Sequence, residues 1–75
     1  MDQNKENQMV VLENRRGVRY YIYNSFVFLR INSHRGIIRL RCQWKMCPAR
    51  ATLTANHDIL YLDEIHNHRP HNVNL

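Results

Sequence analysis

Several features are missing from this chain of 75 residues, and each absence excludes a class of protein. No apolar run is longer than the four residues Phe26–Leu29, so we expect no membrane-spanning helix. The polar first nine residues contain no recognisable secretory signal. No apolar period of about 3.6 residues persists for the ~10 residues that a helix needs, which argues against a helical fold. With 44% apolar and 23% charged residues, the composition favours a small intracellular globular domain.

Acidic residues are missing from the long central part of the chain, between Asn14 and His57. The acids lie on either side of it: Asp2, Glu6, Glu13, Asp58, Asp63 and Glu64. The central part carries these basic residues: Arg15, Arg16, Arg19, Arg30, Arg35, Arg39, Arg41, Lys45 and Arg50. Because the planar arginine fork suits phosphate and carboxylate, this segregation favours a polyanionic partner, with nucleic acid first. The alternative is a soluble surface that merely avoids neutrality.

Cysteine is scarce as well, and Cys42 and Cys47 allow one disulfide at most. A core of this size buries only about 60% of its unfolded surface and needs a further source of stability. His66 and His68 are two residues apart at the end of a predicted strand, so both imidazoles are expected on one face. Two thiolates and two imidazoles form the closed set that structural zinc prefers, whereas calcium and magnesium prefer oxygen. The sequence therefore predicts one structural Zn²⁺ held by these four residues.

Other interpretations of the cysteines and histidines stay open at this stage. The two cysteines could form a disulfide, the stretch HNHRPH could be a solvated tail, and His71 could replace one imidazole. His34 and His57 fall in predicted loops and are expected to take no part. The 18 residues between the Cys pair and the His pair do not fit the common ββα finger. An enzyme is not expected, because four protein ligands leave no place for water and Ser25 and Ser33 have no partner base.

Short alternating or apolar segments separated by turn residues predict an all-β fold. The expected strands are Val10–Leu12, Arg19–Tyr23, Phe26–Ile31, Ile37–Cys42, Ala49–Thr54 and Ile59–Ile65. Asn32–Gly36 is expected to be a loop. We thus expect a small zinc-stabilised all-β domain whose antiparallel sheet has four to six strands in a meander. Residues 1–9 are expected to be a disordered lead, 10–70 the zinc-binding domain, and 71–75 a flexible tail.

Short motifs in a characteristic order run along most of the chain. They comprise an Arg-Gly turn, an aromatic pair, a first cysteine, a second cysteine before Ala-Arg, and a final His-x-His close to proline. Here they are Arg16-Gly17, Phe26 and Phe28, Cys42, Cys47-Pro48-Ala49-Arg50 and His66-Asn67-His68-Arg69-Pro70. In this order they resemble a FLYWCH-type zinc finger, over about Val10 to Pro70. The family tryptophan falls on Leu40, whereas Trp44 lies between the cysteines.

The resemblance implies a fold similar to WRKY-type zinc domains, in which the metal clamps one end of an antiparallel sheet. It also implies a nuclear module of transcription or chromatin regulation, similar to the fingers that end some insect BTB chromatin proteins. Such modules bind DNA or select protein partners, and neither membrane nor small-molecule substrate is implied.

The basic residues define the expected partner surface. Alternation places Arg39, Arg41 and Arg50 on one sheet face. Further cations are expected on loops around that face: Arg15, Arg16, Arg19, Arg35 and Lys45. DNA phosphates or an acidic protein could bind there. The aromatic residues Tyr20, Tyr21, Tyr23 and Trp44 could serve the same surface or pack in the core.

Overall fold

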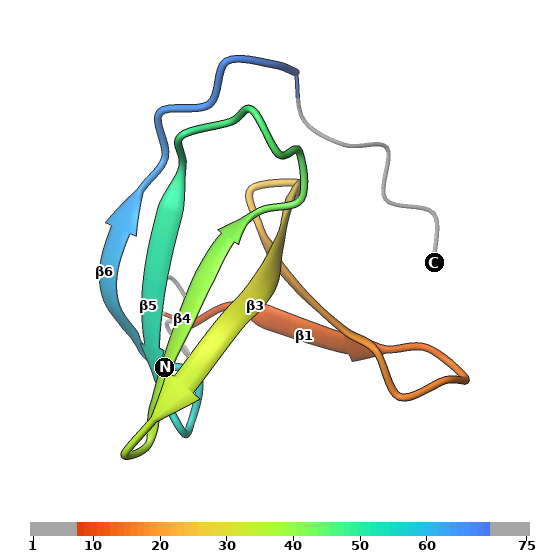
Figure 1. Cartoon of the computed structure of the whole chain (residues 1–75), viewed down its shortest axis with the longest axis vertical. Coiled ribbons are helices and arrows are strands. Elements are labelled where there is room, and N and C mark those ends of the chain that lie inside the picture. The colour runs from red at the N-terminus through yellow and green to blue at the C-terminus, as the bar shows by residue number, and fades with distance from the viewer. Residues whose placement is uncertain (1–7, 70–75) are drawn as a thin grey trace, which may run out of the picture.

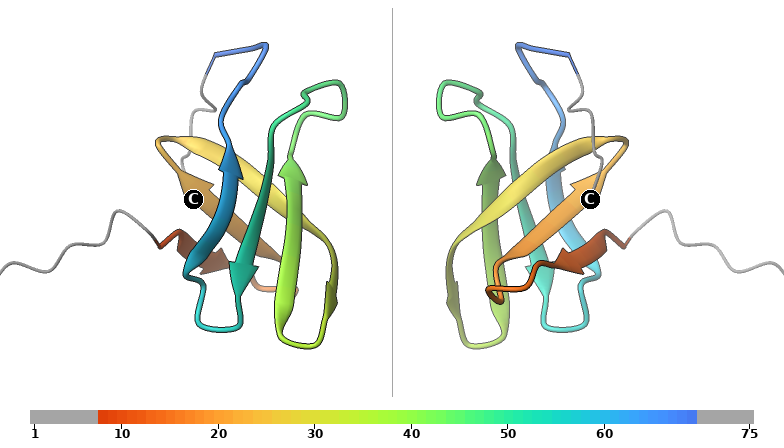
Figure 2. Two further views of the ribbon diagram at one scale, coloured as in Figure 1. Left: turned by 90° about the vertical axis from the view of Figure 1, so that its left-hand side faces the viewer. Right: turned by 90° about the vertical axis from the view of Figure 1, so that its right-hand side faces the viewer.

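The protein is an antiparallel sheet of six strands, and the computed structural model describes residues 8–69 of it. The strands are β1 (Val10–Glu13), β2 (Arg19–Tyr23), β3 (Phe26–His34), β4 (Ile37–Cys42), β5 (Arg50–Thr54) and β6 (Ile59–Asp63). They follow one another across the sheet in chain order, which is a meander. The sheet is strongly curled (Figures 1 and 2), with β3 running diagonally between the β1–β2 hairpin and β4–β6. The predicted all-β fold is therefore confirmed.

Strict alternation decides which face of the sheet forms the core. On β4, which lies between β3 and β5 in the sheet, Leu40 and Cys42 are fully buried, whereas Arg39 is exposed. On β5, Ala51 and Leu53 face the same core. Successive strand residues point to opposite faces, so the apolar residues of β4 and β5 pack inside the curl and the arginines of these two strands stay outside. Burying a side chain of the size of Phe28 contributes about 1.5–3 kcal/mol, so this small core gives the domain limited stability.

Tight turns join the central strands. Asn24 and Ser25 connect β2 to β3 with φ of 51° and 67°, and Arg35 and Gly36 connect β3 to β4 with φ of 52° and 80°. Two-residue hairpin loops favour positive φ at both positions, because this twist matches that of the strands. The β1–β2 turn is built differently: the Asn14 carboxamide oxygen accepts hydrogen bonds from the backbone N–H groups of Arg16 (2.8 Å) and Val18 (3.0 Å).

The curl brings the first described residues against the last hairpin. Gln8 forms an isolated bridge with Asp58, and its side-chain amide donates a hydrogen bond of 2.7 Å to the Asp58 carboxylate. Met9 is buried in the core, 5% exposed. These two residues lie in the segment expected to be disordered and instead pack against the sheet. The expectation for residues 1–7 and for the tail after Arg69 lies outside the described residues.

Two strand boundaries differ from the sequence prediction by more than one residue, and one end each of β1 and β5 differs by a single residue. β3 continues to His34, so only Arg35 and Gly36 remain of the expected loop from Asn32. Polar residues extend this strand because β4 offers a pairing partner along its whole length, with an irregularity between Arg30 and Asn32. β6 ends at Asp63, two residues before the predicted end. Within residues 8–69 no helix is long and apolar enough to cross a membrane.

Candidate metal centre

Four side chains from two distant segments meet at one end of the sheet. The ligand atoms of Cys42, Cys47, His66 and His68 all lie within 4.8 Å of one another. Cys42 Sγ is 3.1 Å from His68 Nε2, and Cys47 Sγ is 3.3 Å from His66 Nδ1. Both cysteines are buried free thiols, so the alternative of a disulfide is not what the structure contains.

A tight loop after β4 places the two sulfurs. Its stem is closed by the Cys42 N–H, which donates to the carbonyl of Ala49 (3.3 Å), and its tip by the Cys47 N–H, which donates to the carbonyl of Trp44 (3.0 Å). The Arg50 guanidinium donates to the carbonyls of Cys47 (3.0 Å) and Ala49 (2.8 Å). This bracing satisfies carbonyl groups of the seven residues that lie between the end of β4 and the start of β5.

The imidazoles come from an irregular segment after β6, which bends at Asn67 and His68, and not from the strand itself. The sequence prediction that both imidazoles share one face of a strand therefore does not hold, although both rings still reach the sulfurs. They do so with different nitrogen atoms, and the ring planes are inclined at 81°. Asn67 between them donates a hydrogen bond of 3.0 Å to the carbonyl of Met46, which ties this segment to the cysteine loop.

Aromatic rings hold both imidazoles in place. Phe26 stacks on His66 with ring centroids 3.5 Å apart and planes within 5°. Trp44 stacks on His68 at 4.5 Å and 3°. The Nδ1 atom of His68 lies 2.7 Å from the carbonyl of Arg69, so a proton on Nδ1 leaves the Nε2 lone pair directed at the cluster. Sequence reasoning found the ligands but considered Trp44 only for the partner surface or the core, and not for the metal site; its place two residues after Cys42 was the available signal.

The two thiols differ in acidity. Burial raises the pKa of Cys42, and the neighbouring Cys47 sulfur raises it further. Burial also acts to raise the pKa of Cys47, but hydrogen bonds from the backbone of Ala49 and Asn67 and from the side chains of Cys42 and His68 together outweigh it and lower this pKa. Cys47 is therefore the thiol that ionises more readily. A bound cation makes thiolates of both, because zinc binds the deprotonated form.

The donor set fits zinc. Bonds of about 2.3 Å to sulfur and about 2.0 Å to nitrogen place the corners of a tetrahedron roughly 3.3–3.8 Å apart. The two Cys–His separations, 3.1 and 3.3 Å, lie near the lower end of this range, and all four ligand atoms lie within 4.8 Å of one another, so a small movement closes them around one ion. The two sulfurs are buried, and the cluster contains no oxygen ligand that calcium or magnesium would require. Cys42, Cys47, His66 and His68 form a zinc-binding site, and His34 and His57 lie on other parts of the described chain. His71, the alternative ligand, lies outside residues 8–69.

The basic residues expected to bind a partner are spread over four regions, one of which, around Arg19, is described below. Register pairs Arg41 with Arg50 across β4 and β5, and Arg39 with Thr52, so these arginines share the outer, convex face of the sheet. Arg15, Arg16 and Arg35 are exposed on the β1–β2 and β3–β4 turns. Lys45 is exposed on the cysteine loop.

Three of these basic side chains have local partners. Arg41 donates to the carbonyl of Cys42 (3.0 Å), and Arg50 holds the cysteine loop as described above. Arg19 lies on the core side of β2 and forms an ion pair of 3.4 Å with Glu13. The aromatic residues of the expected surface also differ in their surroundings. Tyr21 is a core residue at 2% exposure, Tyr23 packs against the core, and Trp44 keeps half of its surface exposed beside the metal site.

Comparison with known proteins agrees with this centre. A scan against protein families matches residues 4–68 to the FLYWCH zinc finger domain. No match was found among curated proteins or among solved structures. The family match spans most of the chain and includes all four clustered ligands. On these grounds the chain belongs to the FLYWCH zinc finger family.

Proposed function

We propose that this zinc finger binds DNA through the convex face of β4 and β5 and acts in transcription or chromatin regulation in the nucleus. The observation that carries the proposal is the placement of Arg39, Arg41 and Arg50 on one exposed face, in a stretch of chain without acids. Phosphate contacts from such a face supply affinity without reading sequence. The metal has a structural role in this proposal, because its four protein ligands leave no place for a reacting water.

The shape of the convex face supports the proposal. A hollow of about 570 Å³ lies there, lined among others by Asn32, Arg39, Arg50, Thr52 and Tyr61. Guanidinium, amide, hydroxyl and phenol groups are the donors that proteins direct at phosphate and sugar oxygens. Arg41 and Arg50 also brace the cysteine loop, so the metal site and the proposed face are connected through their backbone contacts.

A second candidate is a protein-interaction module without DNA contact. The observation that favours it lies at the metal end, where Trp44, Met46 and Ile65 are 53%, 87% and 72% exposed. Tryptophan is enriched among residues that contribute most to protein interfaces. This candidate uses the zinc site to present the loop, and it predicts that binding depends on Trp44 more than on Arg39.

The experiment that tests the proposal is a fluorescence anisotropy titration of the zinc-loaded protein with a labelled random duplex at several salt concentrations. We expect a steep fall of affinity with salt, since counterions are released when phosphates are neutralised. Arg39→Gln is expected to reduce the slope of log K against log salt by about 1, whereas Arg39→Lys retains it.

Arg39 is the right residue to change because its neighbours Arg41 and Arg50 also hold the loop backbone. The matched control is Met46→Ala, which removes an exposed apolar side chain at the metal end and no charge. Weak binding at low salt that does not move with salt contradicts DNA binding. The second candidate is favoured if the duplex does not bind and Trp44→Leu loses a protein partner while it keeps its zinc; the zinc content must be checked because Trp44 stacks on His68.

A further inference from the structure

The sheet splits on the side opposite the convex face. β2 pairs with β3 only through Tyr21↔Phe28, Ile22↔Val27 and Tyr23↔Phe26. Beyond Phe28 the two strands separate, and the rest of β3, Leu29–His34, pairs with β4 alone. One edge of β3 therefore has no strand partner among residues 8–69. An open edge of this kind presents backbone N–H and C=O groups that another extended chain can pair with.

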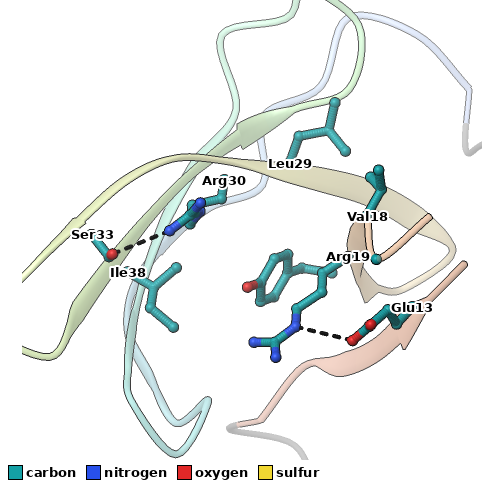
Figure 3. Close-up of a pocket in the computed structure, with 9 residues that line it drawn as sticks. Glu13, Val18, Arg19, Leu29, Arg30, Ser33 and Ile38 are labelled. Carbon is teal, nitrogen blue, oxygen red and sulfur yellow. Dashed lines mark hydrogen bonds and ion pairs between the residues drawn. The ribbon is translucent and has the colours of Figure 1, made fainter.

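The space between the separated strands, which we call the hairpin cleft, has a volume of about 770 Å³. This lies within the ~300–1,000 Å³ of ordinary ligand sites. Figure 3 shows Arg19 on one wall and Arg30 on the other, with Val18, Leu29 and Ile38 around them. The cleft thus combines two guanidinium groups with apolar side chains.

Both arginines are held in place by groups of the cleft itself. The Arg30 guanidinium donates to Ser33 Oγ at 3.3 Å, and Arg19 pairs with Glu13 at 3.4 Å. Register places Arg30 opposite Leu40, a core residue, so its side chain lies on the inner face. Glu13 is the single acid that lines the cleft, against two arginines. The local charge therefore complements an anion and disfavours a cation.

We propose that the hairpin cleft binds an extended, acidic segment of a partner protein, which adds to the open edge of β3 and places a carboxylate between Arg19 and Arg30. A peptide fits better than nucleic acid, because only a peptide can pair with the strand edge and also place alternate side chains on the apolar wall. A second copy of this chain fits poorly, since the same arginines would meet across the contact. Arg30 lies outside the set proposed for DNA, so the two sites are separable.

The test uses the zinc-loaded, ¹⁵N-labelled full chain and a blocked eight-residue peptide of alternating valine and glutamate. We expect chemical-shift changes and slower amide exchange within Leu29–His34, and no effect from the matching valine–lysine peptide. Arg30→Gln is expected to weaken peptide binding about tenfold, as loss of a hydrogen bond to a charged group does. Arg39→Gln on the convex face is expected to leave peptide affinity within twofold.

The same two variants separate this proposal from DNA binding. Arg30→Gln is expected to keep duplex affinity within twofold, whereas Arg39→Gln lowers it. If the duplex has no affinity while the peptide does bind the cleft, the DNA proposal fails and this one stands. Strand addition would be overturned if the peptide shifted signals on the convex face, or if it shifted signals without slowing amide exchange. It would also be overturned if both variants lost the same peptide affinity, or if the duplex shifted the signals of the cleft. Shifts that follow protein concentration alone would assign the edge to self-pairing. Spectra and zinc content of both variants check that they fold.

Discussion

Residues of one type have different surroundings in this domain, and position decides what each contributes. Arg39 extends from the convex face, Arg50 holds the carbonyls of Cys47 and Ala49, and Arg30 turns into the hairpin cleft. All three look alike in a charge pattern. The same holds for the aromatic residues, of which Phe26 and Trp44 stack on metal-binding imidazoles while Phe28 fills the core.

The stacked rings lead to a prediction at this scale. Phe26→Leu removes the ring that lies 3.5 Å from His66, so the imidazole becomes more mobile before metal binding. Aromatic pairs contribute about 0.5–1.5 kcal/mol beyond their buried area, so we expect zinc affinity to fall about 2- to 13-fold. Competition with a chromophoric chelator measures this change. Tyr61→Leu, at an exposed ring on β6, is the control and is expected to keep the affinity; equal effects of both changes would contradict a positioning role for Phe26.

At the scale of elements, the hairpins depend on backbone conformations that their sequences support unequally. The β3–β4 turn has glycine at the second central position, Gly36, and an added Cβ there would meet nothing within 4 Å. The β2–β3 turn has Ser25 at the equivalent position with φ of 67°. A residue other than glycine pays a conformational cost at such an angle. The β2–β3 turn is thus the more strained of the two, and it carries Phe26 to the metal site.

Ser25→Gly relieves that strain. Glycine also has greater conformational freedom in the unfolded chain, which lowers the stability of the folded protein. At turn positions with positive φ the relief of strain is the larger of the two effects, so glycine is favoured there. We expect the free energy of unfolding of the zinc-loaded protein to rise by about 0.5–1 kcal/mol. Urea unfolding measures it. Ser33→Gly within β3 is the control and is expected to lower stability, because glycine weakens a strand interior. A lower stability of Ser25→Gly would show that the turn is not strained.

At the scale of the whole molecule, the metal compensates for a small core. Apart from Met9 at one end of the curl, the largest buried side chains come from β2 to β5, and two of the fully buried residues are the zinc-binding cysteines themselves. Zinc ties the loop after β4 to the segment after β6, which closes one end of the curled sheet. The contact between Gln8 and Asp58 ties the start of β1 to the hairpin between β5 and β6.

Removal of the metal is therefore expected to unfold most of the domain. Structural zinc contributes apparent binding energies of about 10–16 kcal/mol, comparable to the stability of an entire small domain. We expect a chelator to abolish the dispersion of amide NMR signals, and stoichiometric zinc, but not magnesium, to restore it. His66→Ala is expected to behave like the apoprotein, and His34→Ala like the unchanged protein. A dispersed spectrum after complete zinc removal would contradict this role of the metal.

Sequence alone determined the all-β class, the alternation on β4 and β5 and the four metal ligands, because period-two patterning and the Cys and His spacing are local signals. It also placed Arg39, Arg41 and Arg50 on one face, but it did not place Arg19 and Arg30 in a cleft. Tertiary structure decided the rest. Pairing with β4 extended the polar end of β3 to His34, where local preference indicated a loop. The curl of the sheet placed Trp44 on His68 and opened the cleft around Arg30. Local sequence could not predict either feature, because the first joins residues far apart in the chain and the second depends on where two strands diverge.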